Sequence, residues 1–243
     1  ANIGVGGPGM VKAVYSCGKP GFGVGKGNCQ VLVDEDYGDL GSACKDMIAS
    51  RTFQGGVTCT SEQTVHIPVS REEEFLKAMD AAGAYLISDP EQIAKLTELI
   101  FPNNGPINRK IVGRPIQTIA AMIDLVVPEQ YTAIILKNQV TDASNQLGDE
   151  ILAPVIRYTT YENFEDAIEA AVNNLEIHGG AGHSSAIWSN NPERIEQAVL
   201  RMPVGRFHIN QSTRGKENGL PTTVAIGCGA WGGGSACART RLW

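Results

Sequence analysis

The chain has 243 residues, of which 42% are hydrophobic and 19% charged, so it has enough apolar material for one large core or two small ones. It contains no apolar run of about 18 residues that could cross a bilayer, and its start lacks the basic and apolar regions of a signal peptide, so we expect a cytoplasmic protein without a membrane partner. The formal charge is −6 and the Lys and Arg residues are scattered, which excludes the basic stripe that binding to nucleic acid requires.

The first 29 residues contain nine glycines and two prolines. Gly4, Gly6 and Gly9 fit the pattern GxGxxG, but only three residues precede them and Asp34 is the first acidic residue of the chain. A dinucleotide fingerprint needs a hydrophobic strand before the glycines and an acidic residue about 20 positions later. We therefore interpret these glycines as a turn before a helix over residues 10–16, a turn whose backbone can approach a ligand closely.

Through the rest of the chain, short β-branched runs alternate with helical patterns, for example over residues 40–51 and 164–175. Strands are predicted at residues 30–33, 64–69, 132–136, 155–159, 185–188 and 206–210. Ser70 with Glu73 forms a capping-box pattern at a helix start. Two other helix starts are predicted where a capping residue precedes a proline, at Asp89-Pro90 and Asn191-Pro192. The alternation predicts an α/β fold, with a mainly parallel open sheet and helices on both faces.

The six cysteines show no CxxC pair and no regular spacing, so they are interpreted as thiols. They stand at positions 17, 29, 44, 59, 228 and 237. His178 and His183 are the nearest candidates for metal ligands, but they lie in a glycine-rich stretch rather than on one face of a helix. No metal site is expected.

Cys59 follows the paired Gly55 and Gly56, at the end of the helical pattern over residues 40–51. A thiol after such a turn, beside Thr and Ser, can be exposed and surrounded by backbone N–H donors, which stabilise a thiolate and a developing oxyanion. Free cysteines are more often small core residues, however. On these residues alone, a buried thiol before the next strand is the favoured interpretation.

Several sequence segments instead favour a reactive Cys59 over a buried structural thiol, because together they resemble CoA-acylating aldehyde dehydrogenases in order and spacing. They are GGPGMVKAVYSCGKPGFGVGKGNCQVLVDE, FQGGVTCTSEQ, EILAPVIRY, GGAGHSSAIWS, RFHINQ and LPTTVAIGCGAWGGGS, spread over about residues 4–235. The resemblance implies a Rossmann-like cofactor domain, a catalytic α/β domain and an oligomerisation arm. We accordingly expect a remnant of the cofactor domain at 1–33, the catalytic domain at 34–226, and a glycine-rich tail with a truncated arm at 227–243. Most of the cofactor domain is expected upstream of Ala1, and the final string ACARTRLW departs from the family.

The resemblance also implies a mechanism. Cys59 would attack a small aldehyde, hydride would pass to NAD or NADP, and the acyl group would pass to coenzyme A as co-substrate. The intact enzyme would be a homo-oligomer. Hydrolytic relatives carry a glutamate in the loop near residues 23–27, whereas this chain has no Asp or Glu between 1 and 33, which favours acyl transfer over hydrolysis.

Roles for further residues follow from the same resemblance. Glu150 matches the glutamate that holds the nicotinamide ribose, and the turn at Gly6, Gly7 and Pro8 would touch the nicotinamide end. His183 matches a histidine near the cofactor or the CoA entrance, with a structural role equally open. Three more residues are expected to be structural: His66 and His208 in strands, and Cys228 as a small residue lining a loop.

Alternatives remain for the substrate and for the function. The polar set Arg206, His208, Asn210 and Arg214 suggests an anionic aldehyde, but these residues could equally hold the phosphates of CoA or lie on the surface. A second interpretation of the whole chain is a catalytically inactive fragment or pseudo-enzyme with a role in subunit association. A third keeps the enzyme but replaces CoA by phosphate or water as the acyl acceptor.

Overall fold

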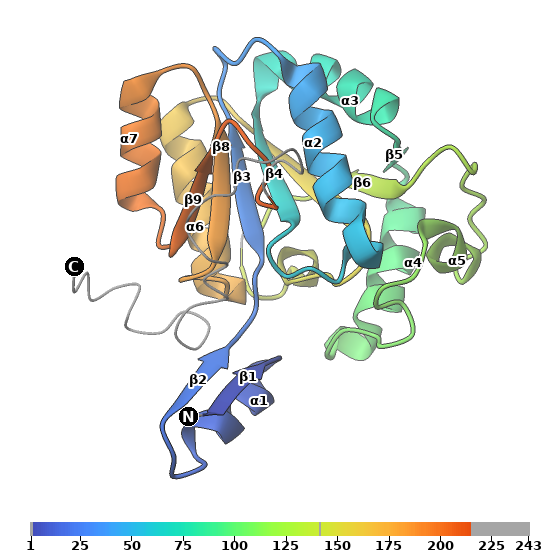
Figure 1. The fold of residues 1–243 in the computed structure, drawn as a ribbon. Coiled ribbons are helices and arrows are strands. Elements are labelled where there is room, and N and C mark those ends of the chain that lie inside the picture. Colours follow the sequence, from blue (N-terminus) through green and yellow to red (C-terminus); the bar gives the residue numbers. More distant parts are fainter. Residues whose placement is uncertain (1, 141, 215–243) are drawn as a thin grey trace.

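The computed structural model describes residues 2–140 and 142–214 (Figure 1). Its main body is a seven-stranded parallel sheet with the strand order β5-β6-β7-β4-β3-β8-β9. The strands are β3 (Cys29–Val33), β4 (Glu62–Pro68), β5 (Ala84–Ile87), β6 (Ala133–Lys137), β7 (Val155–Tyr161), β8 (Ser184–Trp188) and β9 (Arg206–Ile209). Helices cover both faces, so the predicted α/β fold is confirmed.

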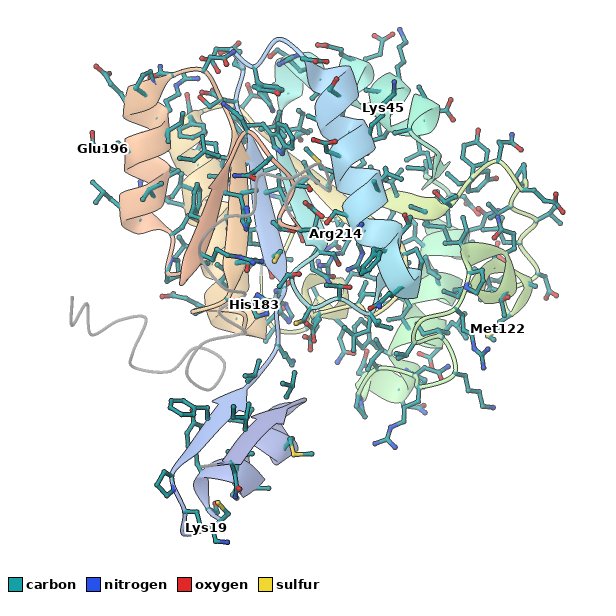
Figure 2. The ribbon with its side chains drawn as sticks, in the orientation of Figure 1. Lys19, Lys45, Met122, His183, Glu196 and Arg214 are labelled. Carbon is teal, nitrogen blue, oxygen red and sulfur yellow. The ribbon has the colours of Figure 1, made fainter. Side chains whose placement is uncertain are left out.

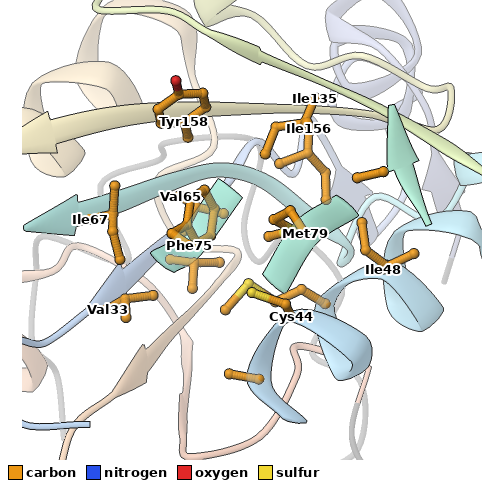
Figure 3. Packing of buried hydrophobic residues seen from close by; sticks show 14 of the residues in the cluster. Val33, Cys44, Ile48, Val65, Ile67, Phe75, Met79, Ile135, Ile156 and Tyr158 are labelled. Atoms are coloured by element: carbon orange, nitrogen blue, oxygen red, sulfur yellow. The ribbon is translucent and has the colours of Figure 1, made fainter. Parts of the chain in front are cut away.

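One face of this sheet is covered by α2 (Leu40–Thr52) and α3 (Glu72–Ala81). The other is covered by α4 (Pro90–Ile100), α5 (Ile116–Ala121), α6 (Phe164–His178) and α7 (Pro192–Arg201). Successive strand residues point to opposite faces, which is why Val31 and Val33 pack with α2 and α3 while Leu32 packs with α6. Phe75 and Met79 fill the first of these cores (Figure 3). No helix of the described residues is long and apolar enough to cross a membrane.

Residues 2–24 form a small separate unit that projects from the main body (Figure 1). In it, β1 (Asn2–Val5) pairs in parallel with β2 (Gly21–Val24), and α1 (Pro8–Tyr15) connects them. The glycines let α1 lie close on the two strands: a Cβ at Gly4 would be 2.4 Å from Val14 Cγ2, and one at Gly23 would be 2.9 Å from Val11 Cγ1. Although only three residues precede the GxGxxG pattern, the strand β1 begins at Asn2 and includes the first glycine of the pattern, Gly4, and the predicted helix after the turn is confirmed.

All six predicted strands are present, within two residues at each end. β5 was not predicted, nor were β1 and β2. The helix starts at Asp89 and Asn191 are confirmed, because each side chain accepts hydrogen bonds from two backbone N–H groups of the first turn.

The prediction of a capping box at Ser70 was wrong. Residues Val69–Arg71 form the 3₁₀ turn η2, and α3 begins at Glu72 without a side-chain cap. The reason is the Arg71 side chain, which donates to the Tyr37 carbonyl and to both carboxylate oxygens of Glu74. These bonds bring residue 71 back to the loop after β3 and delay the helix. The other 3₁₀ turns are η1 (Phe53–Gly56), η3 (Pro102–Asn104) and η4 (Gln146–Gly148).

Residues 1–33 were assigned from the sequence to a remnant of a cofactor domain, and the structure divides the described part of this segment between the projecting unit and the main sheet. β3 pairs with both β4 and β8 near the middle of the main sheet, so residues 29–33 belong to that sheet. The projecting unit ends with β2, at Val24. The tail assigned to 227–243, with Cys228 and Cys237, lies outside the described residues.

Candidate active site

The amino ends of β3, β4, β7 and β8 meet at one edge of the parallel sheet. Cys59 lies there, in the turn between η1 and β4, and His183 directly precedes β8. Figure 2 shows His183 at this edge, beside the connection to the projecting unit. The predicted site residues Cys59, Glu150 and His183 thus come together, although more than 120 residues separate the first from the last.

The loop before Cys59 is shaped by two glycines with positive φ, Gly55 at 67° and Gly56 at 76°. A Cβ at Gly55 would lie 2.4 Å from the Gly113 carbonyl oxygen, and one at Gly56 would lie 2.5 Å from the Ala153 carbonyl carbon. Only glycine fits both the backbone angles and these approaches. The turn leaves Cys59 partly exposed, unlike the buried Cys29 and Cys44.

His183 contacts the thiol directly, with Nε2 3.3 Å from Cys59 Sγ. The imidazole is fully buried, and burial, with a smaller contribution from Arg206, lowers the pKa of His183 to about 4. The ring is therefore neutral at neutral pH. A neutral imidazole can accept the thiol proton at Nε2 or, in the other tautomer, donate Nε2–H to a thiolate.

Glu150, in the loop before β7, extends its carboxyl group to Gly27, which lies beside the Cys59 backbone. Its Oε1 accepts the N–H of Gly27 at 2.7 Å. A Cβ at Gly27 would lie 1.8 Å from the Cys59 carbonyl oxygen and 3.1 Å from Glu150 Oε1, so Gly27 lies against both residues. Burial raises the pKa of Glu150, and the Gly27 hydrogen bond opposes that rise. The neighbouring Asp149 is paired with Lys26 at 2.7 Å.

Apart from Arg206, the polar groups behind the thiol were not foreseen from the sequence. Arg206 donates to Ser184 Oγ at 3.2 Å and to the Thr213 carbonyl at 2.9 Å. Thr213 N–H in turn donates to Glu62 Oε1 at 2.7 Å, and burial raises the pKa of that carboxyl. Carboxyl groups from β4 and from the loop before β7 therefore lie near the thiol, although residues 1–33 supply none.

The structure divides the polar set that suggested an anionic substrate. Arg206 faces the site, whereas Asn210 bonds the backbone of Ser189 at the opposite edge of the sheet. Arg214 stacks on the exposed ring of Phe53, with its guanidinium carbon 3.5 Å from the ring centroid. His208 is buried in β9, as predicted, and burial lowers its pKa to about 4.

The remaining predicted residues lie elsewhere. Gly6 and Gly7 stand at the amino end of α1 in the projecting unit, where Gly7 is the N-cap and Gly6 N–H donates to the Val24 carbonyl. Pro8 is the first residue of that helix. His66 is a strand residue, as predicted, with Nε2 3.0 Å from Gln30 Oε1. Among the described residues, no group of three or more His, Cys, Asp or Glu side chains is arranged to hold a metal ion.

Comparison with known proteins gives consistent matches. A model of the aldehyde dehydrogenase family matches residues 25–223. The chain is 38% identical to the succinate-semialdehyde dehydrogenase (acetylating) of Clostridium kluyveri, over 95% of this chain and 51% of that protein. It is 31% identical to the sulfoacetaldehyde dehydrogenase (acylating) of Bilophila wadsworthia, over 93% of this chain and 50% of that protein.

Solved structures match as well. An acetylating aldehyde dehydrogenase from Geobacillus thermoglucosidasius superposes with a TM-score of 0.84 and 31% identity, over 93% of this chain and 49% of that one. A probable aldehyde dehydrogenase from Listeria monocytogenes superposes with a TM-score of 0.86 and 32% identity, over 97% of this chain and 51% of that one. The chain thus spans about half the length of these relatives.

Proposed function

Because the chain belongs to the aldehyde dehydrogenase family, we propose that it is the catalytic part of an enzyme that oxidises a small aldehyde to an acyl-CoA, with Cys59 as the nucleophile. The observation that carries the proposal is the partly exposed Cys59 thiol, 3.3 Å from a neutral, buried imidazole. The names of the relatives support the acylating branch, since they act on succinate semialdehyde and sulfoacetaldehyde with acyl transfer.

The proposed reaction has two halves. Cys59 Sγ adds to the aldehyde carbon, and the carbonyl oxygen takes up the proton released by the thiol, which gives a thiohemiacetal. Loss of hydride from that carbon and of the hydroxyl proton gives a thioester on Cys59. The CoA thiolate then attacks the thioester carbon, and Cys59 leaves as a thiolate that regains a proton.

His183 is proposed to serve the nucleophile in both halves. Its low pKa keeps the ring neutral, so it does not hold a stable imidazolium beside the sulfur. As neutral imidazole it relays the thiol proton at Nε2, and in the Nε2–H tautomer it stabilises the thiolate that leaves in the second half. The cofactor role assigned to His183 from resemblance is therefore proposed together with this contact to the thiol.

A nicotinamide dinucleotide, when bound, would accept the hydride. The residues present fit such a group at one point: the Glu150 carboxylate uses Oε1 for Gly27 N–H and keeps acceptor capacity for a ribose hydroxyl. Gly27 also lacks the Cβ that would fill the space beside Cys59. We propose that Glu150 holds the ribose and that the turn at Gly6, Gly7 and Pro8 lies toward the nicotinamide.

CoA, rather than water, is proposed as the acyl acceptor. The loop near residues 23–27, where hydrolytic relatives are expected to carry a glutamate that activates water, has no acidic residue. Of the carboxyl groups from other segments, Asp149 is paired with Lys26, and Glu150 and Glu62 accept the backbone N–H groups of Gly27 and Thr213. The thioester would then survive until a thiol nucleophile arrives.

The proposal predicts that Cys59 is the most reactive of the six thiols. The folded chain is treated with limiting iodoacetamide, and the adducts are mapped by mass spectrometry of tryptic peptides. Preferential labelling of Cys59, with strong slowing at that site in a His183→Ala variant, would support the assignment. Faster labelling at Cys17, Cys228 or Cys237 would refute it, and an unreactive Cys59 would favour a catalytically inactive chain.

A further inference from the structure

Two arginines are fully buried behind the Cys59 loop, Arg51 in the last turn of α2 and Arg157 in β7. Burial lowers the pKa of both, to about 10 and about 9, so both remain cations at neutral pH. Within the described residues neither forms a salt bridge, because their hydrogen bonds go to backbone carbonyls and neutral side chains. A buried cation without a paired carboxylate is costly, and an apolar residue of similar volume is often more stable in its place.

Arg51 is connected to the turn that carries Cys59. Its Nη1 donates to Ser61 Oγ at 2.8 Å, and the Ser61 hydroxyl donates to the Thr58 carbonyl at 2.7 Å. The Ser61 N–H donates to the same carbonyl at 3.0 Å. The turn around Cys59 is therefore closed by Ser61, and Ser61 is held by the guanidinium.

The other end of the Arg51 guanidinium is anchored to the segment that carries Glu150. Its Nε donates to the Val155 carbonyl at 3.1 Å, and Nη2 donates to the Ile151 carbonyl. That segment is fixed in turn by Gln63, whose Oε1 accepts Ile151 N–H and whose Nε2 donates to the Ile151 carbonyl, both at 3.1 Å. Arg51 thus joins the nucleophile turn to the Glu150 loop through contacts that all lie in the interior.

We propose that Arg51, acting through Ser61, is a positioning residue that fixes Cys59 relative to His183 and Glu150 and favours the Cys59 thiolate by its buried positive charge. The proposal rests on Cys59 being the nucleophile. A buried cation favours the charged form of an ionising thiol in the same part of the interior, and Arg51 interacts there with Glu150, Glu62 and Cys29 as well. The bond to Ser61 also limits movement of the turn, so the thiol stays at one distance from the imidazole.

Other ionisable groups surround the thiol and contribute to its titration. They are Lys26 and Asp149, Cys29 on β3, Glu62 on β4, Glu150 before β7, His183 before β8 and Arg206 on β9. A change at Arg51 or Ser61 removes none of these groups from the chain. A shift of the titration midpoint therefore reports the loss of the Arg51 charge together with any movement of the Cys59 turn and the Glu150 loop that Arg51 holds.

The test is the pH dependence of iodoacetamide alkylation at Cys59, measured by mass spectrometry from pH 5 to 10 on the 243-residue chain. Arg51→Met removes the charge, Arg51→Lys retains it without the planar fork, and Ser61→Ala cuts the connection to the turn. Residues that bond at the opposite edge of the sheet supply the controls, Ser189→Ala at a buried position and Arg71→Met at a partly buried one. Circular dichroism and thermal unfolding establish which variants are folded.

We expect the alkylation midpoint to rise by about one pH unit in Arg51→Met, which makes labelling at pH 7 about tenfold slower. The midpoint should rise less in Ser61→Ala and stay near that of the parent in Arg51→Lys and both controls. A folded Arg51→Met protein with the midpoint of the parent would overturn the inference. If Arg51→Met does not fold, an unchanged midpoint in Ser61→Ala overturns it instead. Preferential labelling of another cysteine in the unmodified chain would contradict the proposed function itself.

Discussion

Gly27→Ala tests the contact between Gly27, Cys59 and Glu150 most sharply. The new Cβ would be placed 1.8 Å from the Cys59 carbonyl oxygen and 2.6 Å from its carbonyl carbon, both backbone atoms that cannot rotate away. Because interiors are closely packed, the two backbones must separate by more than about 1 Å to restore contact distances. A misplacement of about 1 Å in a catalytic group typically slows a reaction by about 100-fold.

The assay is transfer of the acetyl group from acetyl-CoA to Cys59, and it is monitored by mass spectrometry of the intact protein. We expect Gly27→Ala to be acetylated about 100-fold more slowly than the parent while remaining folded. Gly38→Ala is the matched control, because a Cβ at Gly38 meets nothing within 4 Å. A folded Gly27→Ala protein that is acetylated at the parental rate would refute the proposed geometry.

Two predictions concern stability. His66 is buried and its pKa is lowered to about 3, so between that value and its usual one near 6.5 only the unfolded chain binds the proton. The free energy of unfolding should fall as the pH drops through this window, by at most about 1.4 kcal/mol per unit for this group, and His66→Gln should lose that slope in urea titrations. Parallel slopes in the two proteins would argue against a neutral buried His66. Asp89→Ala removes the acceptor of two N–H groups at the start of α4 and should cost about 1 kcal/mol in thermal unfolding, with Asp89→Asn close to the parent.

The main sheet could be predicted because its strands are β-branched runs bounded by capping residues and glycines. β5 was missed because it has only four residues and only Ala82 and Gly83 separate it from the end of α3, so the pattern gives little sign of a new element. β1 and β2 were not predicted, for a different reason. Their glycines fit the packing of α1, and that packing is a contact between segments rather than a local periodicity.

The site was only partly predictable. Cys59 follows from the glycine pair and the resemblance, but its contact with His183 depends on how β4 and β8 come together at the sheet edge. Arg51 carried a signal that was not used. It continues the helical spacing of Leu40, Cys44 and Ile48, so a charged residue stands on an apolar helix face, which indicates a buried cation with polar partners.

The central claim is that Cys59 carries an acyl group between an aldehyde-derived thioester and CoA. Its most direct test uses acetyl-CoA and this chain, without a redox step. Intact mass should reveal one acetyl adduct, mapped to Cys59 and absent from Cys59→Ser, and added free CoA should discharge it faster than buffer alone. An adduct that forms equally on Cys59→Ser, or that hydrolyses as fast without CoA as with it, would contradict the claim.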